Sequence, residues 1–125
     1  LTRSSSEDSK AQLSRIISNI FEDIFCECIF SGGYPGWEPN INSKILKEVK
    51  KSYIKLFSSE PKVNVIHAGL ECGIIGSHYP EMDMISFGPT ILGAHSPDEK
   101  ASISSTQKFW RFFTEVLANI PQKVD

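Results

Sequence analysis

The sequence predicts an α/β protein, because amphipathic helical patterns alternate with short β-branched segments along its 125 residues. The clearest strand patterns are "VNVIH" at residues 63–67 and "DMISF" at residues 83–87, and both lie between helical patterns. A run rich in glycine and proline, "SGGYPGWEPN" at residues 31–40, cannot continue a helix or a central strand. We therefore predict a domain boundary there, followed by a layered sheet with helices on its faces.

The segment before this break is predicted to contain a strand, a helix and a second strand. Residues 1–4 resemble the end of a strand, and the polar, acidic stretch at residues 5–8 suits a helix N-terminus. A helix over about residues 7–25 is indicated by apolar residues at helical spacing, namely Leu13, Ile16, Ile17, Ile20, Phe21 and Ile24. Residues 26–30 are apolar enough to form the second strand.

After the break, Asn42 is predicted to cap a helix that ends before Pro61. The apolar positions of this helix are Ile45, Leu46, Val49, Tyr53, Leu56 and Phe57. The strand at residues 63–67 follows, and "AGLECGIIG" at residues 68–76 is predicted to hold a glycine turn and a helical turn that stops at Gly76.

The strand at residues 83–87 leads into a loop at residues 88–99, which contains several glycine and proline breaks. Ser104 with Gln107 resembles a capping box at the start of the last helix, and Pro121 ends that helix. The apolar residues of this helix are Phe109, Trp110, Phe112, Phe113, Val116, Leu117 and Ile120.

The residue totals exclude several function classes. A formal net charge of -2 with mixed signs gives no reason to expect binding to nucleic acid or to a membrane surface. No apolar run approaches the roughly 20 residues that span a bilayer, and no export leader is visible. Three loosely spaced cysteines favour reduced thiols in a cytosolic protein. Because the chain begins with Leu1, we expect it to be cut from a longer protein.

His95 lies in "GAHSPDE" and is the sharpest candidate for chemistry. A neutral imidazole is a common metal ligand, and Asp98 or Glu99 could orient it or could close the turn. The alternative is a solvated loop histidine, and spacing alone favours that alternative, since no H-x-x-x-H or C-x-x-C pair accompanies it.

The loop "HAGLECG" at residues 67–73 offers two further candidates. Gly69 allows a ligand carboxylate to approach backbone N–H groups, with Glu71 beside it, or else the glycines serve only a tight turn. Arg3 suits a bidentate contact with a carboxylate, although an ordinary surface arginine is the simpler interpretation. Glu81 and Asp83 would share one face of a strand and could pair as acid and base, but Asp83 is better interpreted as a strand-entry residue.

Three collinear stretches carry a family resemblance: "GGYPGWEPNINSKILKEVKKSYIKLF", "VIHAGLECGII" and "YPEMDMISFGPTILGAHSPDE". They resemble the C-terminal third of the aminoacyl-histidine dipeptidases, also called peptidase D, Xaa-His dipeptidases or bacterial carnosinases. These are two-zinc peptidases with a catalytic domain and a lid domain. The resemblance implies that residues 1–32 end an α+β lid domain with a strand, a helix and a strand. Residues 33–125 would then be the C-terminal part of the catalytic α/β sandwich.

The resemblance also assigns roles to individual residues. It implies that His95 is a ligand of one of the two zinc ions, and that the other ligands and the catalytic glutamate lie outside this chain. Arg3 and Gly69 would contact the substrate carboxylate, with Glu71 in the same pocket. Asp98 and Glu99 would then support the turn or the ligand.

The same resemblance implies a cytoplasmic zinc dipeptidase acting on Xaa-His (carnosine-like) dipeptides, with two Zn²⁺ in the full-length enzyme and dimerisation through the lid domain. The chain alone would need the missing N-terminal part of the protein and would be inactive, since one histidine cannot complete a four-coordinate zinc site. The alternative is a non-catalytic fragment or relative that acts as a binding module.

Overall fold

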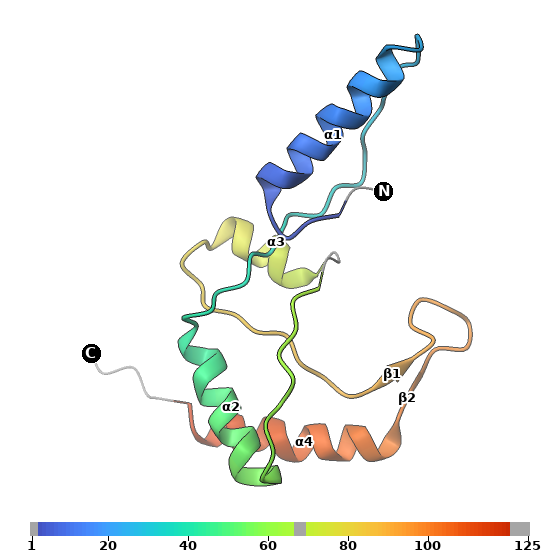
Figure 1. Cartoon of the computed structure of the whole chain (residues 1–125). Coiled ribbons are helices and arrows are strands. Elements are labelled where there is room, and N and C mark those ends of the chain that lie inside the picture. Colours follow the sequence, from blue (N-terminus) through green and yellow to red (C-terminus); the bar gives the residue numbers. More distant parts are fainter. Residues whose placement is uncertain (1–2, 67–69, 121–125) are drawn as a thin grey trace. The chain divides into compact units, whose positions relative to one another are not determined.

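The computed structural model describes residues 3–66 and 70–120 and combines helices with one short pair of strands. In chain order the elements are α1 (Glu7–Glu22), α2 (Lys44–Phe57), α3 (Glu71–His78), β1 (Ile91–Leu92), β2 (Lys100–Ala101) and α4 (Ile103–Ala118) (Figure 1). This mixed composition agrees with the α/β class in its coarse form. Within the described ranges, no helix is long and apolar enough to cross a membrane.

The chain divides into two compact units that interleave along the sequence. The first comprises Leu1–Ile41 and Asn64–Met82, and the second comprises Asn42–Val63 and Asp83–Asp125. A domain boundary near residue 33 stays a prediction.

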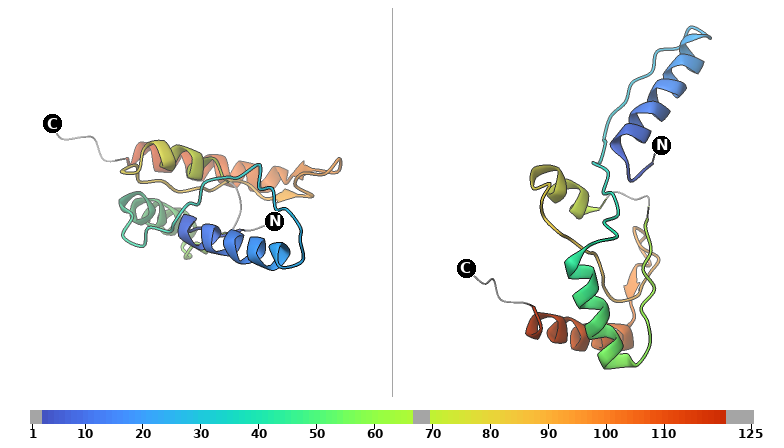
Figure 2. Two further views of the ribbon diagram at one scale, coloured as in Figure 1. Left: turned by 90° about the horizontal axis from the view of Figure 1, so that it is seen from above. Right: turned by 60° about the vertical axis from the view of Figure 1, so that its left-hand side comes forward.

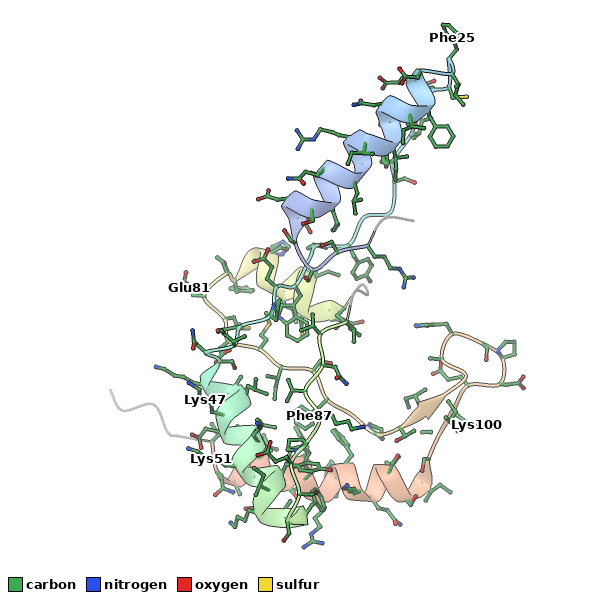
Figure 3. All side chains as sticks on the ribbon, in the orientation of Figure 1. Phe25, Lys47, Lys51, Glu81, Phe87 and Lys100 are labelled. Carbon is green, nitrogen blue, oxygen red and sulfur yellow. The ribbon has the colours of Figure 1, made fainter. Side chains whose placement is uncertain are left out.

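In the first unit, α1 begins where the sequence indicated and ends three residues earlier than predicted. Ser6 is its N-cap, and the backbone of Phe25 adopts a left-handed conformation (φ 60°) just beyond its end. The chain then turns back, and the N–H of Cys26 donates a hydrogen bond to the carbonyl oxygen of Phe21 at 2.9 Å. The Phe25 side chain is fully exposed in the turn beyond the end of α1 (Figure 3).

The segment that returns from α1 is held against the first turn of that helix. The Glu7 carboxylate accepts hydrogen bonds from the Lys10 ammonium at 2.8 Å and from the Gly36 backbone N–H, and Lys10 also donates to the carbonyl oxygen of Tyr34. These donors, Lys10 first, hold the pKa of Glu7 below its ordinary value.

Helix α3 packs against the same returning segment. Gly73 is buried in this helix, and a Cβ atom at that position would lie 2.6 Å from the carbonyl oxygen of Pro35. Glycine at this position therefore allows the close approach. The helix continues two residues beyond Gly76, which was predicted to stop it.

The core of the second unit lies between α2 and α4. Its buried apolar residues are Val49, Phe112 and Val116, with Ile45, Tyr53, Leu56, Phe57 and Ile85 packed around them. α2 crosses the C-terminal half of α4 in Figure 1, and the views in Figure 2 also show these two contacting helices near each other. The Phe112 ring lies edge-on to Tyr53 at 5.2 Å between centroids and is tilted against Phe87 at the same separation.

Two predicted helix caps were wrong by one or two residues. Ser43, rather than Asn42, is the N-cap of α2, and its hydroxyl accepts from the N–H of Leu46 at 3.0 Å. Ser102, rather than Ser104, is the N-cap of α4, with its hydroxyl accepting from Ser105. Each serine satisfies an N–H group that the first turn of a helix leaves without a partner.

The predicted strands form no ladder in the described part of the chain. Residues 26–30, 63–66 and 83–87 have no regular secondary structure there, and the short strands β1 and β2 instead flank the loop predicted at residues 88–99. A β-branched pattern favours extended backbone, but a strand exists only where a second strand pairs with it.

Candidate functional site

His95 lies in the loop that joins β1 to β2. The two strands pair antiparallel, with Ile91 opposite Ala101 and Leu92 opposite Lys100, so the loop closes on a hydrogen-bonded base. Figure 1 shows this loop extending beyond the N-terminal end of α4. The loop is exposed, as a ligand-bearing loop on a rigid scaffold would be.

The base of the loop is fastened to the first turn of α4. The Thr90 N–H donates to the Ser105 hydroxyl at 2.9 Å, and the Ser102 N–H donates to the Thr90 carbonyl oxygen at 3.0 Å. Ser102 is also the N-cap of α4, so one residue serves both the helix start and the hairpin. The serine-rich sequence before the last helix therefore sets the position of the loop as well as starting the helix.

Inside the loop, a series of hydrogen bonds fixes the backbone. Ser96 donates to the carbonyl oxygen of Gly93 through its N–H at 3.1 Å and through its hydroxyl at 2.7 Å. The N–H of Glu99 donates to the carbonyl oxygen of Ser96 at 3.1 Å. Gly93 has φ 65°, a conformation that favours glycine.

His95 itself has a left-handed backbone, with φ 64°. Its N–H donates to Oε2 of Glu99 at 2.7 Å, which is a short, charge-assisted hydrogen bond. Non-glycine residues in this conformation are uncommon, and they persist where surrounding contacts determine them. Several hydrogen bonds within the loop therefore fix the position of His95.

The imidazole ring of His95 is exposed, and neither of its nitrogens bonds to a protein atom among the described residues. An imidazole in this state fits the role of a metal ligand, because one nitrogen must be free to donate its lone pair. The residues described hold no group of three or more His, Cys, Asp or Glu side chains that could bind a metal ion. A metal ion bound by His95 would therefore need further ligands from outside the described residues.

The other predicted site residues lie in the first unit. Arg3 is exposed and precedes α1, and within the described ranges its guanidinium has no ion-pair partner. Glu71 is exposed in the first turn of α3. Gly69 lies outside the described residues. The side chains of Arg3 and Glu71 are thus accessible, and no hydrogen bond or ion pair joins them.

Asp83, predicted to be a strand-entry residue, instead caps a helix. Its Oδ2 accepts from the backbone N–H groups of Lys44 at 2.7 Å and Ile45 at 3.0 Å. Burial raises the pKa of Asp83, but the hydrogen bonds from Ile45, Ser43 and Lys44 outweigh it and leave the pKa below its ordinary value. No local pattern could reveal this contact, because the capped helix lies 38 positions earlier.

No protein-family model matches the chain. Over 92 residues, 74% of its length, the chain is 51% identical to the cytosol non-specific dipeptidase of Escherichia coli (strain K12), of which it covers 19%. It is also similar to the crystal structure of aminoacylhistidine dipeptidase from Vibrio alginolyticus, with a TM-score of 0.79 and 40% identity over 97% of this chain.

The chain covers 25% of that solved protein, so it corresponds to a minor part of each relative. The resemblance to dipeptidases expected from the sequence is confirmed. The small share of each relative that this chain covers also agrees with the expectation that the chain is a fragment.

Proposed function

We propose that this chain is a segment of a metal-dependent dipeptidase and that His95 is one of the ligands of its zinc centre. The observation that carries the proposal is the similarity to a solved aminoacylhistidine dipeptidase over 97% of the chain. The supporting site feature is the exposed imidazole of His95 on a hydrogen-bonded loop, whose ring nitrogens bond to no described residue. The remaining ligands and the general base belong to other parts of the longer protein.

The chemistry of the proposed site divides among a few groups. His95 would hold one zinc ion through a neutral imidazole nitrogen. Zinc, when bound, would supply a water of lowered pKa that could serve as the nucleophile. Arg3 would orient the substrate's terminal carboxylate by two parallel hydrogen bonds, because the guanidinium fork matches a carboxylate.

Two other residues would shape the pocket. Gly69 would bring its backbone near the same carboxylate, and Glu71, at the start of α3, would line the pocket wall. Substrates would be dipeptides, with Xaa-His dipeptides such as carnosine as the preferred class. We further propose two zinc ions per active site, a cytoplasmic location and a homodimer formed through the lid domain of residues 1–32.

The test uses the full-length protein that contains this chain. Purified protein is assayed against a panel of Xaa-His and other dipeptides, and zinc is counted by mass spectrometry. His95→Ala is expected to lose zinc and nearly all hydrolysis. His78→Ala is the matched control. His78 lies at the end of α3, and its Nδ1 is already hydrogen-bonded to the carbonyl oxygen of Ile74. Retention of zinc and activity by His95→Ala would reject the proposed ligand.

The role of Arg3 is tested by kinetics rather than by metal content. Arg3→Ala is expected to raise KM by about 10–100-fold, because a hydrogen bond to a charged group contributes about 1.5–3 kcal/mol. Arg15→Ala, a change on the exposed surface of α1, is the control and should leave KM unchanged. A normal KM in Arg3→Ala would remove this arginine from the substrate site.

A further inference from the structure

The Glu99 carboxylate binds the backbone of His95 and leaves its ring free. Oε2 of Glu99 accepts from the His95 N–H at 2.7 Å, and no described residue bonds to either ring nitrogen. A carboxylate near a metal-binding histidine commonly accepts from the second ring nitrogen, where it sets the tautomer and raises basicity. Glu99 instead acts on the main chain, and thus on the position from which the ring projects.

The need for such a contact follows from the backbone of His95. Its φ of 64° is unfavourable for a residue with a Cβ atom, so the loop must stabilise this conformation by other contacts. The hydrogen bond from its N–H to Glu99 is charge-assisted, and such bonds are roughly twice as strong as neutral ones. The N–H of Glu99 is itself bound to the Ser96 carbonyl oxygen, which holds the carboxylate in register with the loop.

The neighbouring carboxylate provides a contrast. The Asp98 side chain makes no hydrogen bond or ion pair within the described part of the chain, although it lies in the same exposed loop. Only its backbone is close to the turn: a Cβ atom at Gly93 would lie 3.2 Å from the Asp98 carbonyl oxygen. The two adjacent acids therefore differ in structural role, which the sequence alone does not distinguish.

From these contacts we infer that Glu99 is a positioning residue that holds His95 in its left-handed conformation and so presents the imidazole to the zinc ion. The inference rests on the proposed function, because it concerns the same histidine. Asp98 has no part in this positioning.

The first experiment measures the loop without reference to the metal. Hydrogen exchange of the His95 N–H is followed in the zinc-free full-length protein. Glu99→Ala is expected to accelerate this exchange, whereas Asp98→Ala is expected to leave it unchanged. Equal exchange in Glu99→Ala and the wild-type protein would overturn the inference.

The second experiment measures zinc release to a chelator. Glu99→Ala is expected to release zinc about tenfold faster than the wild-type protein, the lower end of the range for residues that support a metal ligand. Asp98→Ala should release it at the wild-type rate. If His95→Ala loses zinc but Glu99→Ala releases it normally, the inference fails while the proposed function stands. If His95→Ala retains its zinc, the proposed function fails and the inference fails with it.

Two conservative variants separate the effect of side-chain length from the effect of charge. They also replace Glu99→Ala if that variant does not fold. Glu99→Gln keeps an oxygen acceptor at the same distance but loses the charge, so it is expected to retain part of the His95 N–H protection. Glu99→Asp keeps the charge but shortens the side chain by one methylene, so it is expected to lose that protection. The reverse order would show that charge alone matters and would overturn the positioning role.

Discussion

Oδ2 of Asp83 accepts a hydrogen bond from the backbone N–H of Ile45 at 3.0 Å, across 38 positions of sequence. The same oxygen accepts from Lys44 at 2.7 Å, while Ser43 accepts from Leu46. Three N–H groups in the first turn of α2 are thereby satisfied, two of them by a residue outside the helix. This contact joins the segment that leads toward the His95 loop to the start of a core helix.

Removal of the Asp83 carboxylate should destabilise the start of α2. Asp83→Ala is expected to lower the free energy of local opening by about 0.5–2 kcal/mol, the range for the loss of a helix cap. Hydrogen exchange at the N–H groups of Lys44 and Ile45 measures this opening directly. Glu81→Ala, a change at the exposed neighbour labelled in Figure 3, is the control. An equal effect from both variants would contradict the capping role.

The same contact predicts a dependence of stability on pH. The folded-state pKa of Asp83 is lowered, so its contribution is fully present above the unfolded pKa of about 3.9 and is lost as pH falls through the lower folded value. The difference in stability between the wild-type protein and Asp83→Ala should therefore be constant near neutral pH and should shrink below about pH 4.

Urea denaturation from pH 3 to pH 7 measures that difference. The pKa values of Glu7 and Glu115 are also lowered, but both residues titrate in the two proteins alike, so their effects cancel. A difference that grows as pH falls would reverse the assigned sign and reject the interpretation.

The helices were predictable because their signals are local. Apolar spacing located α2 and α4, and the caps predicted for them, Asn42 and Ser104, lie one and two residues from the true caps. The predicted strands failed for a different reason. The pattern of residues 83–87 describes how side chains alternate, but pairing depends on a partner strand that local sequence does not specify.

The candidate site also has features that the local sequence predicts and features that it does not. His95 was identifiable from its residue type and from the turn residues around it, whereas spacing gave it no metal partner. The bond from its N–H to Glu99 depends on a left-handed φ at His95, a conformation that is uncommon even for histidine and that no local pattern specifies. The cap formed by Asp83 was missed because its partner is distant in sequence.

The close approach of α3 to the returning segment predicts an unusual effect for a helical glycine. Gly73→Ala should destabilise the protein by about 1–3 kcal/mol, because the added Cβ would meet the carbonyl oxygen of Pro35 at 2.6 Å. This outcome opposes helix propensity, which favours alanine by about 1 kcal/mol. Urea denaturation provides the measurement, with Gly88→Ala as the control since its added Cβ would meet no atom within 4 Å.

The last prediction concerns the aromatic cluster between α2 and α4. Phe112 is buried and contacts Tyr53 and Phe57 on α2 and Phe87 on the segment before β1. Phe112→Ala should reduce stability by about 3–5 kcal/mol, because the cavity left behind cannot collapse completely. Figure 3 labels Phe87, whose ring would lose its contact with Phe112.

The control for that change lies two positions earlier on the same helix. Trp110 is 63% exposed, so Trp110→Ala should cost less than about 1 kcal/mol although it removes more atoms. Urea denaturation compares the two variants, and equal losses would place the core elsewhere. Because Phe87 precedes β1 by four positions, Phe112→Ala should also accelerate hydrogen exchange at the Thr90 N–H, whereas Trp110→Ala should not.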